Sequence, residues 1–102
     1  PERLPTTTQL LANYPNPFNP ETWIPFELAE DAVVTVTIYD VQGQRIRQLP
    51  LGLVTAGRYV TADQAAYWNG KSETGEAVAS GTYFYQLQAG DYTETRKMVI
   101  LK

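Results

Sequence analysis

The sequence contains neither cysteine nor histidine among its 102 residues. Without cysteine the chain has no disulfide, no thiolate nucleophile and no cysteine-ligated metal site. Without histidine it lacks the side chain that proteins use most often as a general base and as a metal ligand. Catalysis or metal binding would therefore have to rely on carboxylates, hydroxyls, amides, lysine and arginine.

Long apolar runs and basic clusters are also absent. No apolar stretch approaches the roughly 20 residues that a membrane-spanning helix requires, so we expect no membrane insertion. The eight lysine and arginine residues are dispersed and the formal net charge is −3, so we expect no nucleic-acid partner, which would need a basic patch.

The length of the chain suits one domain with a single core. Residues 1–8 are polar and contain proline, so we expect them to be the end of an interdomain linker, with the folded domain at 9–102. The first residue is Pro1 rather than methionine. We therefore expect the chain to be part of a longer protein, with any signal peptide in the upstream part.

Proline and aromatic residues are concentrated in residues 13–26, which we call the proline clasp. Each proline fixes φ at about −65° and removes one backbone donor, which predicts a rigid, extended crossing and not a helix or a central strand. The aromatic surface is large, so we expect the clasp to lie on a core built by later strands and not to act as a proline-rich ligand. The residues assigned to this structural role are Tyr14, Pro15, Asn16, Pro17, Phe18, Asn19, Pro20, Trp23 and Phe26.

Alternation of apolar and polar side chains predicts about seven short strands. The clearest case is 33–39, where Val34, Val36 and Ile38 are expected to point inward. Pro25 should mark the edge of a strand or a bulge, and the last two strands should form a hairpin. The predicted strands are 9–14, 22–28, 33–39, 44–49, 63–69, 81–89 and 92–101, with a crossover between sheets at 51–62.

Strands with turn signals about every eight to twelve residues are typical of an immunoglobulin-like sandwich. We therefore predict an all-β fold, an immunoglobulin-like antiparallel β-sandwich of about seven strands with no disulfide. Because the Cys-Trp-Cys core of antibody domains is missing, Trp68 and the clasp aromatics are expected to fill the space between the sheets.

The ionisable side chains give little indication of catalysis. Nearly all the candidate acids lie in predicted turns, where solvation or local hydrogen bonding explains them. Ser72 and Ser80 have no histidine to activate them, and Lys71 lies next to Ser72 in a flexible turn. We therefore expect a protein that is not an enzyme and uses no cofactor. The acids are Asp31, Asp40, Asp63, Glu73, Glu76 and Asp91.

Two groups of residues are candidates for a binding site. Asn69, Ser72 and Glu73, with Asp63, offer oxygen atoms to calcium. Their spacing does not match an EF-hand loop, and we favour a hydrogen-bonded turn without a metal.

Trp23 and Phe84, if exposed, are candidates for a sugar-stacking platform or a protein contact, although packing in a small sandwich explains them equally well.

Five motifs occur in order along the chain: Tyr14-Pro-Asn-Pro-Phe-Asn-Pro20, Thr22-Trp-Ile-Pro-Phe26, Ile38-Tyr-Asp40 with Gly43, Ala79-Ser-Gly-Thr-Tyr-Phe-Tyr85, and Lys97-Met-Val-Ile-Leu-Lys102. Over residues 14–102 this pattern closely resembles the C-terminal sorting domain, type A, of the type IX secretion system. The middle part, including Ala56-Gly57, Trp68-Asn-Gly70, Gly75 and Val78-Ala-Ser-Gly-Thr-Tyr83, is also similar to the immunoglobulin-like domain of the flagellar hook-capping protein. Asn69 stands where related domains often carry Asp.

The resemblance implies a non-catalytic sandwich that directs an upstream cargo domain of the same chain through the outer-membrane translocon. Its partners would be the translocon and the sorting machinery, and its location the outside of the cell or the outer-membrane surface, reached through the periplasm. Such domains are commonly cleaved off, with the cargo attached to surface lipopolysaccharide. The recognition residues that the resemblance implies are Gly81, Tyr83, Tyr85, Lys97, Met98, Val99, Ile100, Leu101 and Lys102.

A physical reason for recognition at this end is that a last strand at a sheet edge has free backbone groups, which a partner can extend by strand addition. For the side chains of Val99 and Leu101 we favour a simple core position. Two other functions remain open from the sequence: a structural immunoglobulin-like module of a cell-surface or flagellar cap protein, and a carbohydrate-binding β-sandwich.

Overall fold

Nine β-strands and no helix make up residues 3–102, the part of the chain that the computed structural model describes. Accordingly, no helix that could cross a membrane is found in this range. The strands are β1 (Gln9–Leu10), β2 (Thr22–Ile24), β3 (Phe26–Leu28), β4 (Ala32–Tyr39), β5 (Arg45–Val54), β6 (Gly57–Tyr59), β7 (Ala66–Trp68), β8 (Gly81–Ala89) and β9 (Tyr92–Ile100).

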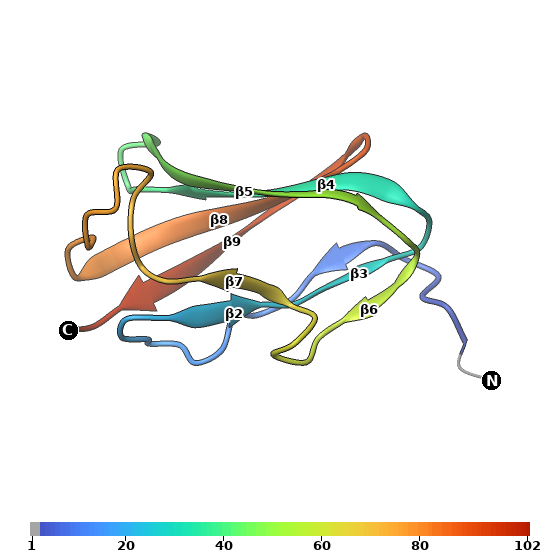
Figure 1. Ribbon diagram of the computed structural model, residues 1–102, viewed down its shortest axis with the longest axis horizontal. Helices are drawn as coiled ribbons and strands as arrows, with labels where there is room; N and C mark the ends of the chain where they lie inside the picture. Colours follow the sequence, from blue (N-terminus) through green and yellow to red (C-terminus); the bar gives the residue numbers. More distant parts are fainter. Residues whose placement is uncertain (1–2) are drawn as a thin grey trace.

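The strands form two layers (Figure 1). One layer is a four-stranded sheet in the order β5-β4-β8-β9, and the other consists of the sheet β1-β3-β6 beside the pair β2-β7. All strand pairs are antiparallel. The predicted antiparallel sandwich without a disulfide is confirmed, and β8 and β9 form the predicted hairpin.

The core lies between the layers and follows from side-chain alternation. Val34, Val36 and Ile38 are fully buried, as predicted. Trp68 also fills the space between the layers, with an exposure of 1%. The buried apolar residues are Leu10, Phe18, Ile24, Phe26, Leu28, Val34, Val36, Ile38, Ala66, Trp68, Val78, Tyr83, Tyr85, Leu87, Ala89, Met98 and Ile100.

The strand number exceeds seven because one predicted strand is divided in two and the predicted crossover contains a further strand. Pro25 separates β2 from β3, and the two halves pair with different strands, β2 with β7 and β3 with β1 and β6. The predicted crossover at 51–62 instead contains the end of β5 and all of β6. β5 runs past Pro50 with a register shift between Val34 and Thr35 of its partner strand, the kind of irregularity that an edge strand accommodates.

The expected core positions in the last strand are wrong. Leu101 is 63% exposed and Val99 is only partly buried, whereas Met98 and Ile100 lie in the core. The register explains this, because Met98 lies opposite Tyr83, and directly paired residues share a face of the sheet. Since Tyr83 faces inward, Met98 does so as well.

The proline clasp is a closed loop and not the extended crossing that was predicted. Tyr14 and Trp23 exchange two backbone hydrogen bonds of 2.9 and 2.8 Å, so the two ends of the loop are paired. The peptide bonds preceding Pro15, Pro17 and Pro20 are cis. The pairing of Tyr14 with Trp23 shows that the loop turns back on itself between its two ends.

The segment before β1 packs on the domain. The hydroxyl oxygen of Thr8 accepts a hydrogen bond from the Ala29 amide at 3.0 Å, and Pro5 is buried. Residues 1–2 of the predicted linker lie outside the described residues, so the boundary of the domain at residue 9 stays a prediction.

Candidate functional site

The clasp and the last strand, which carry three of the five motifs, bond to each other. The Phe18 amide donates to the Val99 carbonyl at 3.1 Å, and the Leu101 amide donates to the Phe18 carbonyl at 3.0 Å. The Val99 amide donates to the side-chain oxygen of Asn16 at 3.0 Å. Phe18 thus forms a parallel bridge with Ile100 along the outer edge of β9, and 83 residues separate Asn16 from Val99 in the sequence.

This pairing corrects the expectation of a free edge. β9 is the edge strand of its sheet, but the backbone groups of Val99 and the amide of Leu101 already have partners in the clasp. Further along the same edge, the Glu94 carboxylate accepts the Leu10 amide at 2.8 Å and the Arg96 guanidinium donates to the Leu10 carbonyl at 3.5 Å. Charged side chains on an edge strand protect it from unwanted pairing.

The nine residues implied in recognition divide into two groups. Tyr83, Tyr85, Met98 and Ile100 are buried, with exposures of 8% or less, so no partner can touch them in the folded domain. Gly81, Lys97, Leu101 and Lys102 are exposed, and Val99 is partly exposed. The Lys102 amide donates to the hydroxyl of Ser80 at 3.0 Å, which holds the end of the described chain beside the start of β8.

The two buried tyrosines have structural partners. The Tyr85 hydroxyl accepts the Asn13 amide at 3.0 Å and donates to the Leu11 carbonyl at 2.9 Å, so it fixes the entry to the clasp. Burial raises the pKa of Tyr85 above its ordinary 10.0. The Tyr83 hydroxyl donates to the Ala79 carbonyl at 2.8 Å, and burial, followed by the Asp40 charge, raises the pKa of Tyr83.

The clasp aromatics divide in a similar way. Phe18 is 2% exposed and makes an edge contact with Trp68, with ring centroids 5.8 Å apart. Phe26 stacks on Tyr59 at 5.1 Å. These two rings fill the core as predicted. Tyr14 and Trp23, in contrast, remain on the outer surface.

Gly70 is a contact of the clasp that the sequence did not single out for this role. Its φ is +78°, and a Cβ placed on it would lie 2.3 Å from the Pro20 carbonyl oxygen. Only glycine allows the clasp to approach the loop after β7 so closely. The available signal was the Asn-Gly turn, which indicates the positive φ but not the partner.

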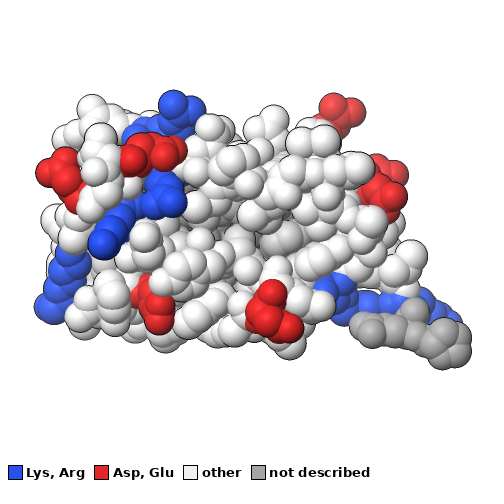
Figure 2. Space-filling view, in the orientation of Figure 1, with Lys and Arg blue, Asp and Glu red and all other residues white. Residues whose placement is uncertain are grey.

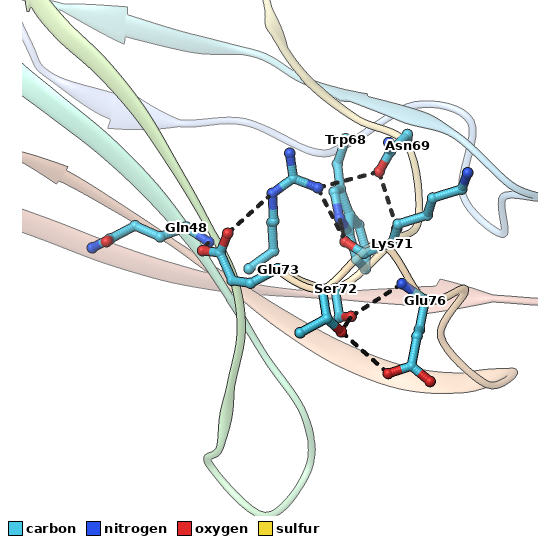
Figure 3. Close-up of polar contacts among 9 residues, drawn as sticks. Gln48, Trp68, Asn69, Lys71, Ser72, Glu73 and Glu76 are labelled. Carbon is cyan, nitrogen blue, oxygen red and sulfur yellow. Dashed lines mark hydrogen bonds and ion pairs between the residues drawn. The ribbon is translucent and has the colours of Figure 1, made fainter.

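The loop 69–76 uses its oxygen atoms within the protein (Figure 3). Asn69 accepts hydrogen bonds from the Lys71 amide at 3.0 Å and from the Arg47 guanidinium at 3.5 Å. Glu73 accepts the Gln48 amide at 2.8 Å and lies 3.7 Å from Arg47. The guanidinium thus already provides a positive charge between these two candidate calcium ligands. Within residues 3–102 no group of three or more carboxylates is placed to hold a metal ion.

The remaining acids also make local bonds. Asp40 accepts the amides of Gln42 and Gln44, each at 2.9 Å, and so closes the turn after β4. Asp31 accepts the Ala56 amide at 2.8 Å. On the face shown in Figure 2, acidic and basic side chains are interspersed and most of the surface is uncharged.

Trp23 and Phe84 do not form one platform. Trp23 lies on the outer face of β2, whereas Phe84 lies on the outer face of the four-stranded sheet, opposite Tyr39 and Lys97. These faces are on opposite sides of the sandwich. Trp23 instead contacts Tyr14 and Tyr67, with ring centroids 6.3 and 5.5 Å apart.

The chain is similar to known proteins in both sequence and fold. The model of a family described as the FlgD Ig-like domain matches residues 19–93. No curated protein matches the sequence.

Two solved structures share the fold. Dimeric latent PorU from Porphyromonas gingivalis matches with a TM-score of 0.67 and 19% identity, over 90% of this chain and 9% of the PorU chain. PorZ from the same organism, described as an essential bacterial surface component of its type-IX secretion system, matches with a TM-score of 0.62 and 20% identity, over 89% of this chain and 11% of the PorZ chain. This chain therefore corresponds to about a tenth of the length of either protein.

Proposed function

The chain belongs to the FlgD Ig-like domain family, and from its motifs at 14–20 and 97–102 we propose that it is a non-catalytic C-terminal sorting domain. It would direct a larger secreted protein through the type IX outer-membrane translocon to the cell surface, without a cofactor. The upstream part of that protein would be the cargo, and the translocon and sorting machinery the partners.

The observation that carries the proposal is the bonding of the clasp to the last strand. The motifs at 14–20 and 97–102 resemble those of the sorting domain, and their backbones are joined at Phe18, Val99 and Leu101. The join holds the last residues in one geometry, so that a receptor meets a preorganised surface and loses less entropy on binding. The fold shared with PorZ, itself described as a type-IX secretion component, adds support.

In this proposal the receptor contacts the side chains that remain accessible: Lys97, Leu101 and Lys102, with the partly exposed Val99. The buried recognition candidates act indirectly, because Tyr83, Met98 and Ile100 hold the hairpin on the core. A hairpin alone is marginally stable in water. We therefore expect a fusion of residues 81–102 to export cargo less efficiently than a fusion of residues 9–102.

The test is export of a reporter fused to residues 9–102 in a host that has this translocon. Leu101→Asp should reduce export strongly, while Val41→Asp, a control at a position of similar exposure, 67% against 63%, should leave export intact. Retention of the unmodified fusion in the periplasm, while an authentic secreted protein of the host is exported, would refute the proposal. Equal export by both variants would exclude Leu101 from recognition.

A second candidate function is a structural immunoglobulin-like module of a cell-surface or flagellar cap protein. The family match at residues 19–93 favours it. The gene context discriminates between the two. A sorting domain follows a signal peptide and an enzyme or adhesin domain, whereas a cap module belongs to a protein of flagellar assembly.

A further inference from the structure

Three aromatic side chains stand in register across the outer surface of the second layer. Tyr14 lies opposite Trp23 in an antiparallel bridge, and Trp23 lies opposite Tyr67 where β2 pairs with β7. The ring centroids are 6.3 Å apart between Tyr14 and Trp23 and 5.5 Å apart between Trp23 and Tyr67. We call these three residues the aromatic row.

The aromatic row is accessible. Tyr14 is 37% exposed and Tyr67 46% exposed, and Trp23 between them is partly exposed. The neighbouring side chains in the same two strands, Ile24 and Trp68, point into the core. The row therefore contributes little to the space between the layers and faces the solvent.

Both ends of the row are fixed. The Tyr14 hydroxyl donates to the Val60 carbonyl at 2.5 Å, and the Tyr67 hydroxyl donates to the Glu21 carboxylate at 2.6 Å. With Trp23 held between them, the rings lose little further freedom when a ligand stacks on them, which favours binding.

The surroundings of the row indicate the kind of ligand. The groups bonded to it are a carbonyl and a carboxylate, so the aromatic rings lie beside hydrogen-bond acceptors. The adjoining sheet shows a polar row, Gln9, Glu27 and Arg58, in which Gln9 donates to Glu27 at 2.9 Å and Arg58 lies 3.4 Å from Glu27. A hydrophobic protein interface typically has an apolar centre that is larger than one line of rings.

A pyranose ring matches this arrangement, because one face presents C–H groups that stack on an aromatic ring while the rim presents hydroxyls that donate to acceptors. A line of rings suits a linear chain of sugars. The Glu21 carboxylate at one end disfavours acidic sugars through like-charge repulsion. We propose that the aromatic row is a binding site for a neutral glycan chain. The site is independent of the proposed sorting function.

The aromatic row also supports the pairing of β2 with β7, since cross-strand aromatic pairs stabilise sheets. Binding must therefore be measured separately from stability. The probes are cellohexaose and mannohexaose as neutral chains, with oligogalacturonate as the acidic control. Titrations of the whole chain are followed by tryptophan fluorescence and by NMR, with the buried Trp68 indole as an internal reference.

We expect at least one neutral chain to shift the Trp23 and Tyr67 signals and to leave those of Trp68 unchanged. Tyr67→Ala should weaken binding by about tenfold or more, equivalent to the loss of one stacking contact of about 1.4 kcal/mol. Phe84→Ala, on the opposite outer face, should leave the affinity unchanged. Oligogalacturonate should not bind.

Tyr67 is varied first because it is exposed and its replacement leaves the core intact. Trp23→Phe, which keeps a ring, provides a second variant. Absence of saturable binding by both neutral chains at millimolar concentration would overturn the proposal, as would binding that Tyr67→Ala and Trp23→Phe both leave unchanged. Self-association that Tyr67→Ala abolishes, without sugar binding, would assign the row to a second copy of the chain and would also overturn it.

Discussion

Replacement of Phe18 by alanine tests the role of the clasp most directly. The ring is 2% exposed and contacts Trp68 in the core, and removal of a buried phenylalanine ring usually costs about 3 to 5 kcal/mol. A domain of this size has a total stability of about 5 to 15 kcal/mol. The substitution should therefore remove a large fraction of the free energy of unfolding, while the backbone bonds of residue 18 to Val99 and Leu101 remain chemically possible.

The assay is urea denaturation followed by tryptophan fluorescence, since Phe18 contacts Trp68. The denaturation midpoint should fall with little change in slope, which is the signature of lost stability. By the same scale the melting temperature should fall by more than about 10 °C. Phe84→Ala, on the outer face of β8, is the matched control and should cost less than about 1 kcal/mol. A loss for Phe18→Ala as small as that of the control would mean that the ring is not buried in solution, and the description of the clasp would be wrong.

Three further predictions concern named contacts. Gly70→Ala should cost about 2 to 5 kcal/mol in a denaturation experiment, because it combines an unfavourable positive φ with a clash against Pro20. The control Gly43→Ala, at a φ of +83° in open space, should cost only about 1 to 2 kcal/mol. Equal losses of stability in the two variants would refute the close contact. Asn16→Ala should cost about 1 kcal/mol, because the Val99 amide loses its acceptor, and Asn19→Ala, an exposed clasp residue also followed by proline, should be neutral by the same measurement. Because burial raises the pKa of Tyr85 above 10.0, the folded state binds that proton more tightly, so stability is complete below pH 10 and falls as the pH rises above it. Tyr85→Phe should be less stable at neutral pH, and its melting temperature should fall less steeply with pH above pH 10. An unchanged slope of melting temperature against pH in that range would exclude Tyr85 as the cause of the alkaline loss of stability.

The local sequence pattern was sufficient to predict the inward face of strands whose two faces differ clearly in polarity. In β4, valine and isoleucine alternate with threonine and tyrosine, and the inward face followed directly. At the end of β9 both faces carry apolar residues, Val99 on one and Met98 and Ile100 on the other, and Leu101 follows directly after the strand. Only the register with β8 decides between them, and that register is set outside the alternating segment, by the two-residue turn that pairs Ala89 with Tyr92.

The candidate site was predictable only in part, because the composition of a segment does not indicate its partners elsewhere in the chain. The composition of the clasp indicated buried aromatic rings and an intramolecular role, and the burial of Phe18 and Phe26 agrees with that prediction. That the clasp closes on itself, and that it covers the end of β9, depends on hydrogen bonds between segments far apart in sequence. Arg47 illustrates the same difficulty, because nothing in its neighbourhood along the chain indicates that it supplies the positive charge between Asn69 and Glu73.

The join between the clasp and β9 also sets a time order for biosynthesis. Asn16 and Phe18 emerge from the ribosome before their partners Val99 and Leu101, which are synthesised 83 residues after them. At elongation rates of about 5 to 20 residues per second, the clasp must wait roughly 4 to 17 s for those partners. During that interval Phe18 has no completed pocket, and the nascent domain offers an unburied aromatic ring to chaperones until the last strand arrives.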